Sequence, residues 1–64
     1  MKAAEVVRRL KADGWHELSG KKTSHRHFKH PSKPGKVTVP FHKGKDINPF
    51  TVKSIELQSG VSMA

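Results

Sequence analysis

The sequence contains no cysteine, and this absence excludes two common scaffolds for small proteins. Domains that fold around disulfides, and domains that fold around a thiolate-bound zinc ion, both need cysteine. Acidic residues are also few, and no two of them have a spacing suited to a divalent metal or to an acid–base pair of carboxylates. Their scatter argues against a two-metal nuclease and against a glycosidase. The five acidic residues are Glu5, Asp13, Glu17, Asp46 and Glu56.

Long apolar runs are missing as well. No run approaches the roughly 18 residues that a membrane-spanning helix needs, and the N-terminus lacks the apolar segment of a secretory signal. We therefore expect a soluble, cytoplasmic protein with no membrane partner. The 64 residues are enough for a single domain, spanning 1–64, with a small core. Any chemistry then takes place on a surface or in a shallow groove.

Positive charge is what the sequence has in excess. Thirteen Lys and Arg residues against five Asp and Glu residues give a formal net charge of +8. A field of this size favours an anionic partner, which could be nucleic acid, an acidic protein or anionic lipid. For a small domain this basic, nucleic acid is the leading candidate. The simpler alternative is a solvated surface that keeps the protein in solution.

Two helices are predicted, one at each end of the chain. The first covers residues 1–13, where apolar residues fall on one stripe, and Gly14 follows at the position where helices commonly end. The second begins after Asn48, a good N-cap, with Pro49 at the first helical position, and ends at Gly60. The stripe of the first helix consists of Ala3, Val6, Val7 and Leu10.

Three short strands are predicted between the helices, over residues 15–18, 24–29 and 36–39. Turn sequences at 19–22 and 30–35 separate them, and Pro40 closes the third strand. The lone Trp15 is expected in the core, because an indole buries a large apolar area. The predicted fold class is α+β with the order α-β-β-β-α. An antiparallel sheet of three strands is covered on one face by two amphipathic helices and meets water on the other.

The middle strand alternates in character and carries two of the five histidines. Phe28 is its apolar anchor, so alternation directs Ser24 and Arg26 with it toward the helices. The residues predicted to face outward are His25, His27 and Lys29.

The residues alone leave several interpretations of these histidines open. His25 and His27 could chelate a metal with His30 or His42 as third ligand, although the usual spacing signature of a zinc site is absent. An exposed imidazole among cations could instead cleave RNA without metal. It would move the proton of the 2′-hydroxyl or of the leaving 5′-oxygen, while Lys and Arg stabilise the charge at phosphorus. His25 and His27 could also be ordinary surface histidines without a chemical role.

Motifs along nearly the whole chain resemble the HicA toxin family of bacterial type II toxin–antitoxin systems. In the central segment, family members usually read Gly-Ser-His, and this chain has Thr23 where the glycine stands. The matching segments are Ala12-Asp13-Gly14-Trp15, Ser24-His25-x-x-Phe28-x-His30-Pro31, Val37-Thr38-Val39-Pro40 with His42, and Val52-Lys53-Ser54-Ile55 leading to Gly60-Val61-Ser62.

The resemblance implies a fold like that of double-stranded-RNA-binding domains and an activity that cleaves messenger RNA to inhibit translation. It implies His25 as the catalytic residue, places His27 at a variable position, and implies a HicB-like antitoxin that blocks the site. We therefore predict a metal-independent endoribonuclease without cofactor, a monomer within a larger toxin–antitoxin complex. Proximity and charge add four candidate phosphate contacts, and Ser24, which matches the motif, is a fifth candidate RNA contact. The four are Lys22, Arg26, Lys29 and Lys36.

Two alternatives to an enzyme stay open. A non-catalytic RNA-binding module would bind RNA with a steep salt dependence and leave the strand intact. An interaction protein would use its net charge of +8 only to bind an acidic partner.

Overall fold

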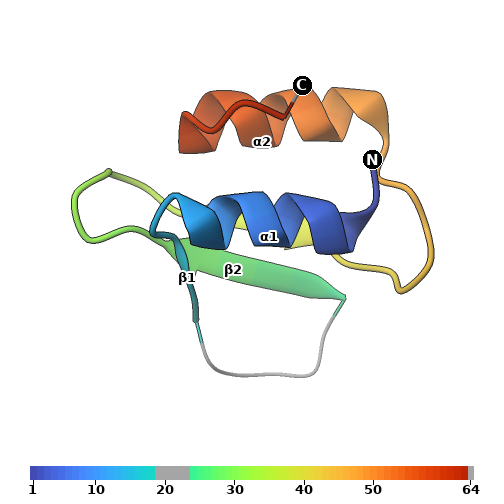
Figure 1. Ribbon diagram of the computed structural model, residues 1–64, viewed down its shortest axis with the longest axis horizontal. Helices are drawn as coiled ribbons and strands as arrows, with labels where there is room; N and C mark the ends of the chain where they lie inside the picture. The colour runs from blue at the N-terminus through green and yellow to red at the C-terminus, as the bar shows by residue number, and fades with distance from the viewer. Residues whose placement is uncertain (19–23, 64) are drawn as a thin grey trace.

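The computed structural model describes residues 1–18 and 24–63, and its elements follow the predicted order (Figure 1). The strands form one antiparallel sheet in the order β1-β2-β3. The predicted α+β fold with a three-stranded meander is therefore confirmed, and the predicted turn at 19–22 lies outside the described residues. The elements are α1 (Ala3–Ala12), β1 (His16–Glu17), β2 (His25–Lys29), β3 (Val37–Pro40) and α2 (Pro49–Ser59).

Helix α1 buries the stripe that the sequence predicted, with its four apolar residues on the core side. It is shorter at both ends than the predicted range of 1–13. Lys2 is its N-cap, and Asp13 closes its last turn by donating its backbone N–H to the carbonyls of Arg9 and Leu10. The chain then reverses through Gly14, and the Trp15 N–H also returns to the Leu10 carbonyl. This reversal places the indole, 1% exposed, inside the core.

At position 14, a side chain would be unfavourable for two reasons. The φ of Gly14 is +105°, and a Cβ built there would lie 2.9 Å from Nε2 of His30. We expect Gly14→Ala to lower the free energy of unfolding by more than the roughly 1–3 kcal/mol of left-handed strain alone, measured by urea denaturation. Gly44→Ala is the matched control, since its φ is +76° and nothing lies within 4 Å of its Cβ. Equal losses in the two variants would contradict the His30 contact.

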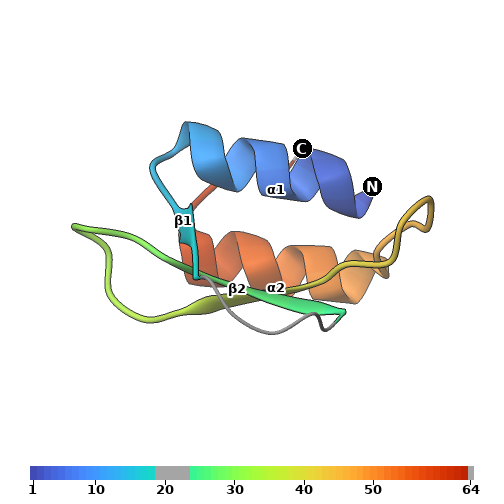
Figure 2. The same ribbon diagram turned by 90° about the horizontal axis from the view of Figure 1, so that it is seen from below.

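The two faces of the sheet differ in character because of the strand register. Phe28 pairs with Val37 and Arg26 pairs with Val39, so these four residues share the face that looks toward the helices. Phe28 and both valines are fully buried. Figure 2 shows α1 on one side of the strands, and in both ribbon views α1 and α2 run in the same direction.

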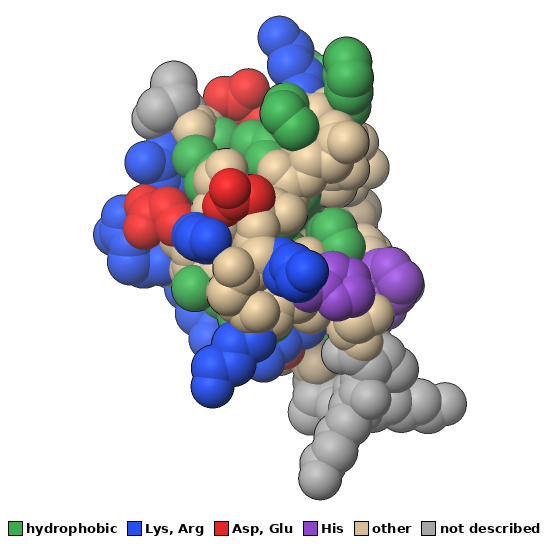
Figure 3. Space-filling view, turned by 90° about the vertical axis from the view of Figure 1, so that its right-hand side faces the viewer, with side chains coloured by type: hydrophobic (Ala, Val, Ile, Leu, Met, Phe, Trp, Pro, Cys, Tyr) green, Lys and Arg blue, Asp and Glu red, His purple; other side chains and the backbone are tan. Residues whose placement is uncertain are grey.

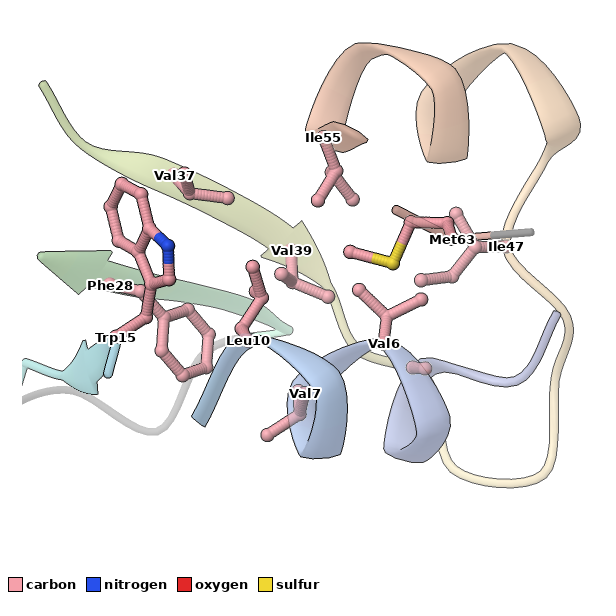
Figure 4. Close-up of a cluster of buried hydrophobic side chains, with 11 residues drawn as sticks. Val6, Val7, Leu10, Trp15, Phe28, Val37, Val39, Ile47, Ile55 and Met63 are labelled. Carbon is pink, nitrogen blue, oxygen red and sulfur yellow. The ribbon is translucent and has the colours of Figure 1, made fainter. Parts of the chain in front are cut away.

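The core lies between this face of the sheet and the two helices (Figure 4). Both helices contact β3, one of the two edge strands of the meander. Met63, which follows α2, is also buried, and its N–H donates to the Glu56 carboxylate at 2.9 Å. No pattern in the sequence predicted this contribution. The core residues are Ala3, Val6, Val7, Leu10, Trp15, Phe28, Val37, Val39, Ile47, Ile55 and Met63.

Helix α2 has the predicted ends but a weaker apolar face than predicted. The Asn48 side chain accepts a hydrogen bond from the Phe50 N–H at 2.8 Å, and Gly60 ends the helix with a φ of +71°. Only Ile55 and Ser59 of the helix are fully buried. Phe50 and Leu57 are instead 86% and 75% exposed. Neither α1 nor α2 is long and apolar enough to cross a membrane, and residues 1–18 and 24–63 form no other helix.

The stability of the folded protein should depend on pH through the charge cluster on α1 that contains Glu5. Glu5 accepts hydrogen bonds from Arg8 and from Arg9, the latter at 2.8 Å, and these lower its pKa from 4.5 to about 2. A carboxyl whose pKa falls on folding stabilises the folded state above its unfolded pKa, and this contribution is lost as protonation proceeds. We therefore expect stability to fall as the pH drops from 4.5 toward 2, and to fall less in Glu5→Gln. Urea denaturation across this pH range measures both, and identical pH profiles would contradict the role of Glu5.

Candidate functional site

The sheet face opposite the core, called the open face, collects polar and basic side chains. The register pairs His25 with Pro40, His27 with Thr38 and His16 with Lys29, and these residues alternate with the buried set. The register agrees with the predicted outward direction of His25, His27 and Lys29. Seen from the side, histidine side chains gather on the surface with a Lys or Arg side chain next to them (Figure 3).

His25 begins β2 at one end of the open face and is exposed. It follows directly on Ser24, the first described residue after position 23. Along a strand, positions two apart are separated by about 6.6 Å and point to the same side. His25 and His27 are therefore neighbours on one surface, two positions apart on the same strand.

His27 is half-buried and has a partner on the next strand. Its Nδ1 lies 2.9 Å from Oγ1 of Thr38, directly across the β2–β3 pair. This hydrogen bond fixes the plane of the imidazole. The other ring nitrogen, Nε2, lies on the far side of the ring from the threonine.

His30 is held differently, although it was one of two possible third ligands in the metal interpretation of the sequence. Its Nδ1 accepts hydrogen bonds from the backbone N–H groups of Ser32 and Lys33, at 3.0 and 3.2 Å. The ring proton is therefore on Nε2, which donates to the Asp13 carbonyl at 2.8 Å. The ring also meets the edge of Trp15, with centroids 5.2 Å apart, and only 9% of the side chain is exposed. His30 thus joins the end of α1 to the turn after β2.

The proposed metal ligands do not come together. Within residues 1–18 and 24–63, no group of three or more His, Asp or Glu side chains is arranged to hold a metal ion. The His30 ring packs against Trp15, and His42 is exposed in the loop after β3.

Lys33 forms a bridge between three parts of the chain. Its Nζ lies 2.6 Å from Oδ2 of Asp13 and donates to the Ser59 carbonyl at 3.1 Å. The Lys33 ammonium lowers the pKa of the Asp13 carboxyl below its usual value of 3.8. The bridge ties the end of α1, the turn after β2 and the end of α2 together at one end of the sheet.

The five predicted RNA contacts have different surroundings. Lys29 lies on the open face, and Lys36 is exposed just before β3. Ser24 is exposed, and its carbonyl accepts the Phe41 N–H. Lys22 lies outside the described residues.

Arg26 is the predicted RNA contact with the least suitable position. It shares the core-facing side of β2, but its side chain is 39% exposed. Its Nε lies 3.5 Å from Oε2 of Glu17, and its Cζ lies 4.0 Å from the centre of the Phe41 ring. A phosphate would have to compete with Glu17 and Phe41 for this side chain.

Thr38 and His16 are residues of the open face that the sequence analysis did not select. The alternation of Val37-Thr38-Val39 was enough to predict that Thr38 faces outward, because apolar residues on both sides of it are expected in the core. Both valines are indeed buried. The pairing of Thr38 with His27 could not be predicted, since it depends on the register between β2 and β3. His16 reaches the open face through the pairing of β1 with β2.

Comparison with protein families gave one match of direct relevance. A family model described as the HicA toxin of bacterial toxin–antitoxin systems matches residues 3–61, a span that includes all five elements. A comparison with curated proteins gave no match.

Proposed function

The chain belongs to the HicA family of toxins from bacterial toxin–antitoxin systems, and we propose that it is an endoribonuclease that cleaves messenger RNA and so inhibits translation. The observation that supports this most directly is His25, exposed on the open face of a domain with net charge +8. The positive field attracts the RNA, and the imidazole supplies proton transfer near neutral pH.

RNA brings its own nucleophile, so the protein has little covalent chemistry to perform. The 2′-hydroxyl attacks the adjacent phosphorus as a base removes its proton. The bond from phosphorus to the 5′-oxygen breaks as an acid protonates that oxygen. The products are a 2′,3′-cyclic phosphate and a 5′-hydroxyl. We propose His25 as one of these two groups, and no metal takes part.

Cations beside the reacting phosphate would stabilise its developing charge. Lys29 is the best placed of the described candidates, because it lies on the open face two positions from His27. Ser24 and Lys36 are exposed nearby in sequence or register and would contact the flanking backbone. Lys22 is retained as a candidate from its charge and its proximity to His25 in the sequence, and Arg26 would first have to leave Glu17.

The test uses the purified protein, a messenger RNA and analysis of the RNA ends. Cleavage that persists in EDTA and leaves 2′,3′-cyclic phosphate and 5′-hydroxyl ends supports the proposal. Salt-sensitive binding without cleavage would indicate the non-catalytic RNA-binding module. Activity that disappears in EDTA would favour a metal held by His25 and His27.

A toxin of this family is paired with an antitoxin. We propose that this antitoxin is a HicB-like protein that covers the open face and His25. One toxin chain would bind as a monomer within the larger complex. Its positive charge would speed association with an acidic antitoxin surface. Antitoxin and RNA should then compete for the toxin. Simultaneous binding of both would contradict steric blocking.

A further inference from the structure

The proposed reaction needs two proton-transfer groups, and His25 can be only one of them. We infer that His27 is the other, so that the pair His25 and His27 acts as base and acid on one RNA phosphodiester. This inference rests on the proposed function and names a catalytic residue that the family match does not supply. It is carried by the contact between His27 and Thr38.

A hydroxyl is a suitable partner for an imidazole that gains and loses protons. Thr38 Oγ1 accepts a hydrogen bond when Nδ1 of His27 is protonated and donates one when it is not. The 2.9 Å contact therefore persists in both neutral tautomers and in the imidazolium ion. His27 can change its charge at Nε2 without losing the bond that fixes its ring.

His30 shows the contrary arrangement in the same molecule. Its Nδ1 accepts from two backbone N–H groups, and these can never accept a proton in return. A proton on Nδ1 of His30 would break both contacts, because neither partner can accept it. The ring also lies against Trp15 and is largely buried. Of these two histidines, only His27 combines a fixed ring with a partner that tolerates both protonation states.

The positions on β2 suit a shared phosphodiester. His25 and His27 lie on one side of the strand, about 6.6 Å apart along the backbone. One imidazole takes the proton of the 2′-hydroxyl as the bond from that oxygen to phosphorus forms. The other gives a proton to the 5′-oxygen as its bond to phosphorus breaks. Each turnover leaves one ring with an extra proton and the other without one, and exchange with water restores both.

The experiment uses an RNA that carries a mapped cleavage site, with sulfur in place of the 5′-oxygen at that bond. A thiolate leaves without protonation, so a variant that lacks the acid regains its rate on this RNA, and a variant that lacks the base does not. The proteins compared are the wild type, His25→Ala and His27→Asn, where the asparagine keeps a polar atom near the position of Nδ1. Circular dichroism verifies that each variant is folded.

We expect each variant to cleave ordinary RNA about 10²-fold or more slowly than wild type, the usual contribution of one acid or base. Sulfur should restore one variant to near the wild-type rate and leave the other slow, and the restored variant identifies the acid. Wild-type rates for His27→Asn on ordinary RNA would overturn the inference while leaving the proposed function intact. Equal deficits of His27→Asn and His25→Ala on both RNAs would also overturn it. If His25→Ala is fully active as well, the proposed function fails.

Thr38 is a positioning residue in this scheme, and two variants isolate its hydroxyl. Thr38→Val keeps the size and branching of the side chain and removes Oγ1, whereas Thr38→Ser keeps Oγ1. We expect Thr38→Val to slow cleavage about 10-fold or more, because a loosened ring misplaces its reactive nitrogen. Thr38→Ser should restore most of the rate. In the His27→Asn background, Thr38→Val should have little further effect, and an undiminished effect there would contradict the coupling.

Discussion

The His25→Ala variant is expected to lose RNA cleavage by about 10²–10⁴-fold, the range that a single general acid or base contributes. His25 is exposed and lies outside the core cluster, so the free energy of unfolding should change little. The measurements are the rate of RNA cleavage in vitro and growth arrest when the variant is expressed in cells. RNA cleavage and growth arrest should be lost together, because under the proposed function the toxicity follows from the cleavage.

A neighbouring histidine supplies the control for this prediction. His16 is also exposed on the open face but comes from β1, where it pairs with Lys29. We expect His16→Ala to cleave RNA at nearly the wild-type rate. If His25→Ala were as active and as toxic as wild type, His25 would not be the catalytic residue. If both variants lost activity equally, the effect would reflect general loss of an imidazole from this surface.

The Phe28→Ala variant is expected to unfold the protein. Phe28 is fully buried in the middle strand, and removing a buried phenylalanine side chain costs about 3–5 kcal/mol. A domain of this size has a net stability of only about 3–5 kcal/mol. Circular dichroism should therefore show loss of helix and sheet at room temperature, with loss of RNA cleavage as a secondary effect.

An exposed phenylalanine tests whether the loss depends on burial. Phe50 on α2 is 86% exposed, so Phe50→Ala removes the same atoms without opening a cavity. Urea denaturation should give a change within about 0.5 kcal/mol for this variant, as for other surface substitutions. A cooperatively folded Phe28→Ala variant of near wild-type stability would contradict the packing described for the core.

Much of the fold could be predicted because its signals are local. The caps of α2 depend on the residues Asn48, Pro49 and Gly60 themselves, and the stripe of α1 follows from its own spacing. Contacts between distant residues gave no such signal. Met63 lies in the core with its N–H bonded to the Glu56 carboxylate seven positions earlier, and β1 is limited to the two residues that pair with β2.

The candidate site was predictable in part for the same reason. Alternation along β2 was enough to place His25 and His27 on one face, but it treated them alike. What distinguishes His27 is Thr38, which is eleven positions away in sequence. What removes His30 from the site is the carbonyl of Asp13, seventeen positions away. Both contacts appear only when the register and the packing of α1 are known.

The separation of core and open face on alternate positions of the same strands has an evolutionary consequence. His25 is exposed and lies outside the core cluster, so under the proposed function a substitution there would remove the chemistry in one step and keep the shape that an antitoxin would bind. Such an inactive copy would still occupy antitoxin and withhold it from active toxins in the same cell. Under the proposed function, a strand with one buried and one exposed face would thus allow a toxin to evolve into an inactive decoy for the antitoxin without any change of fold.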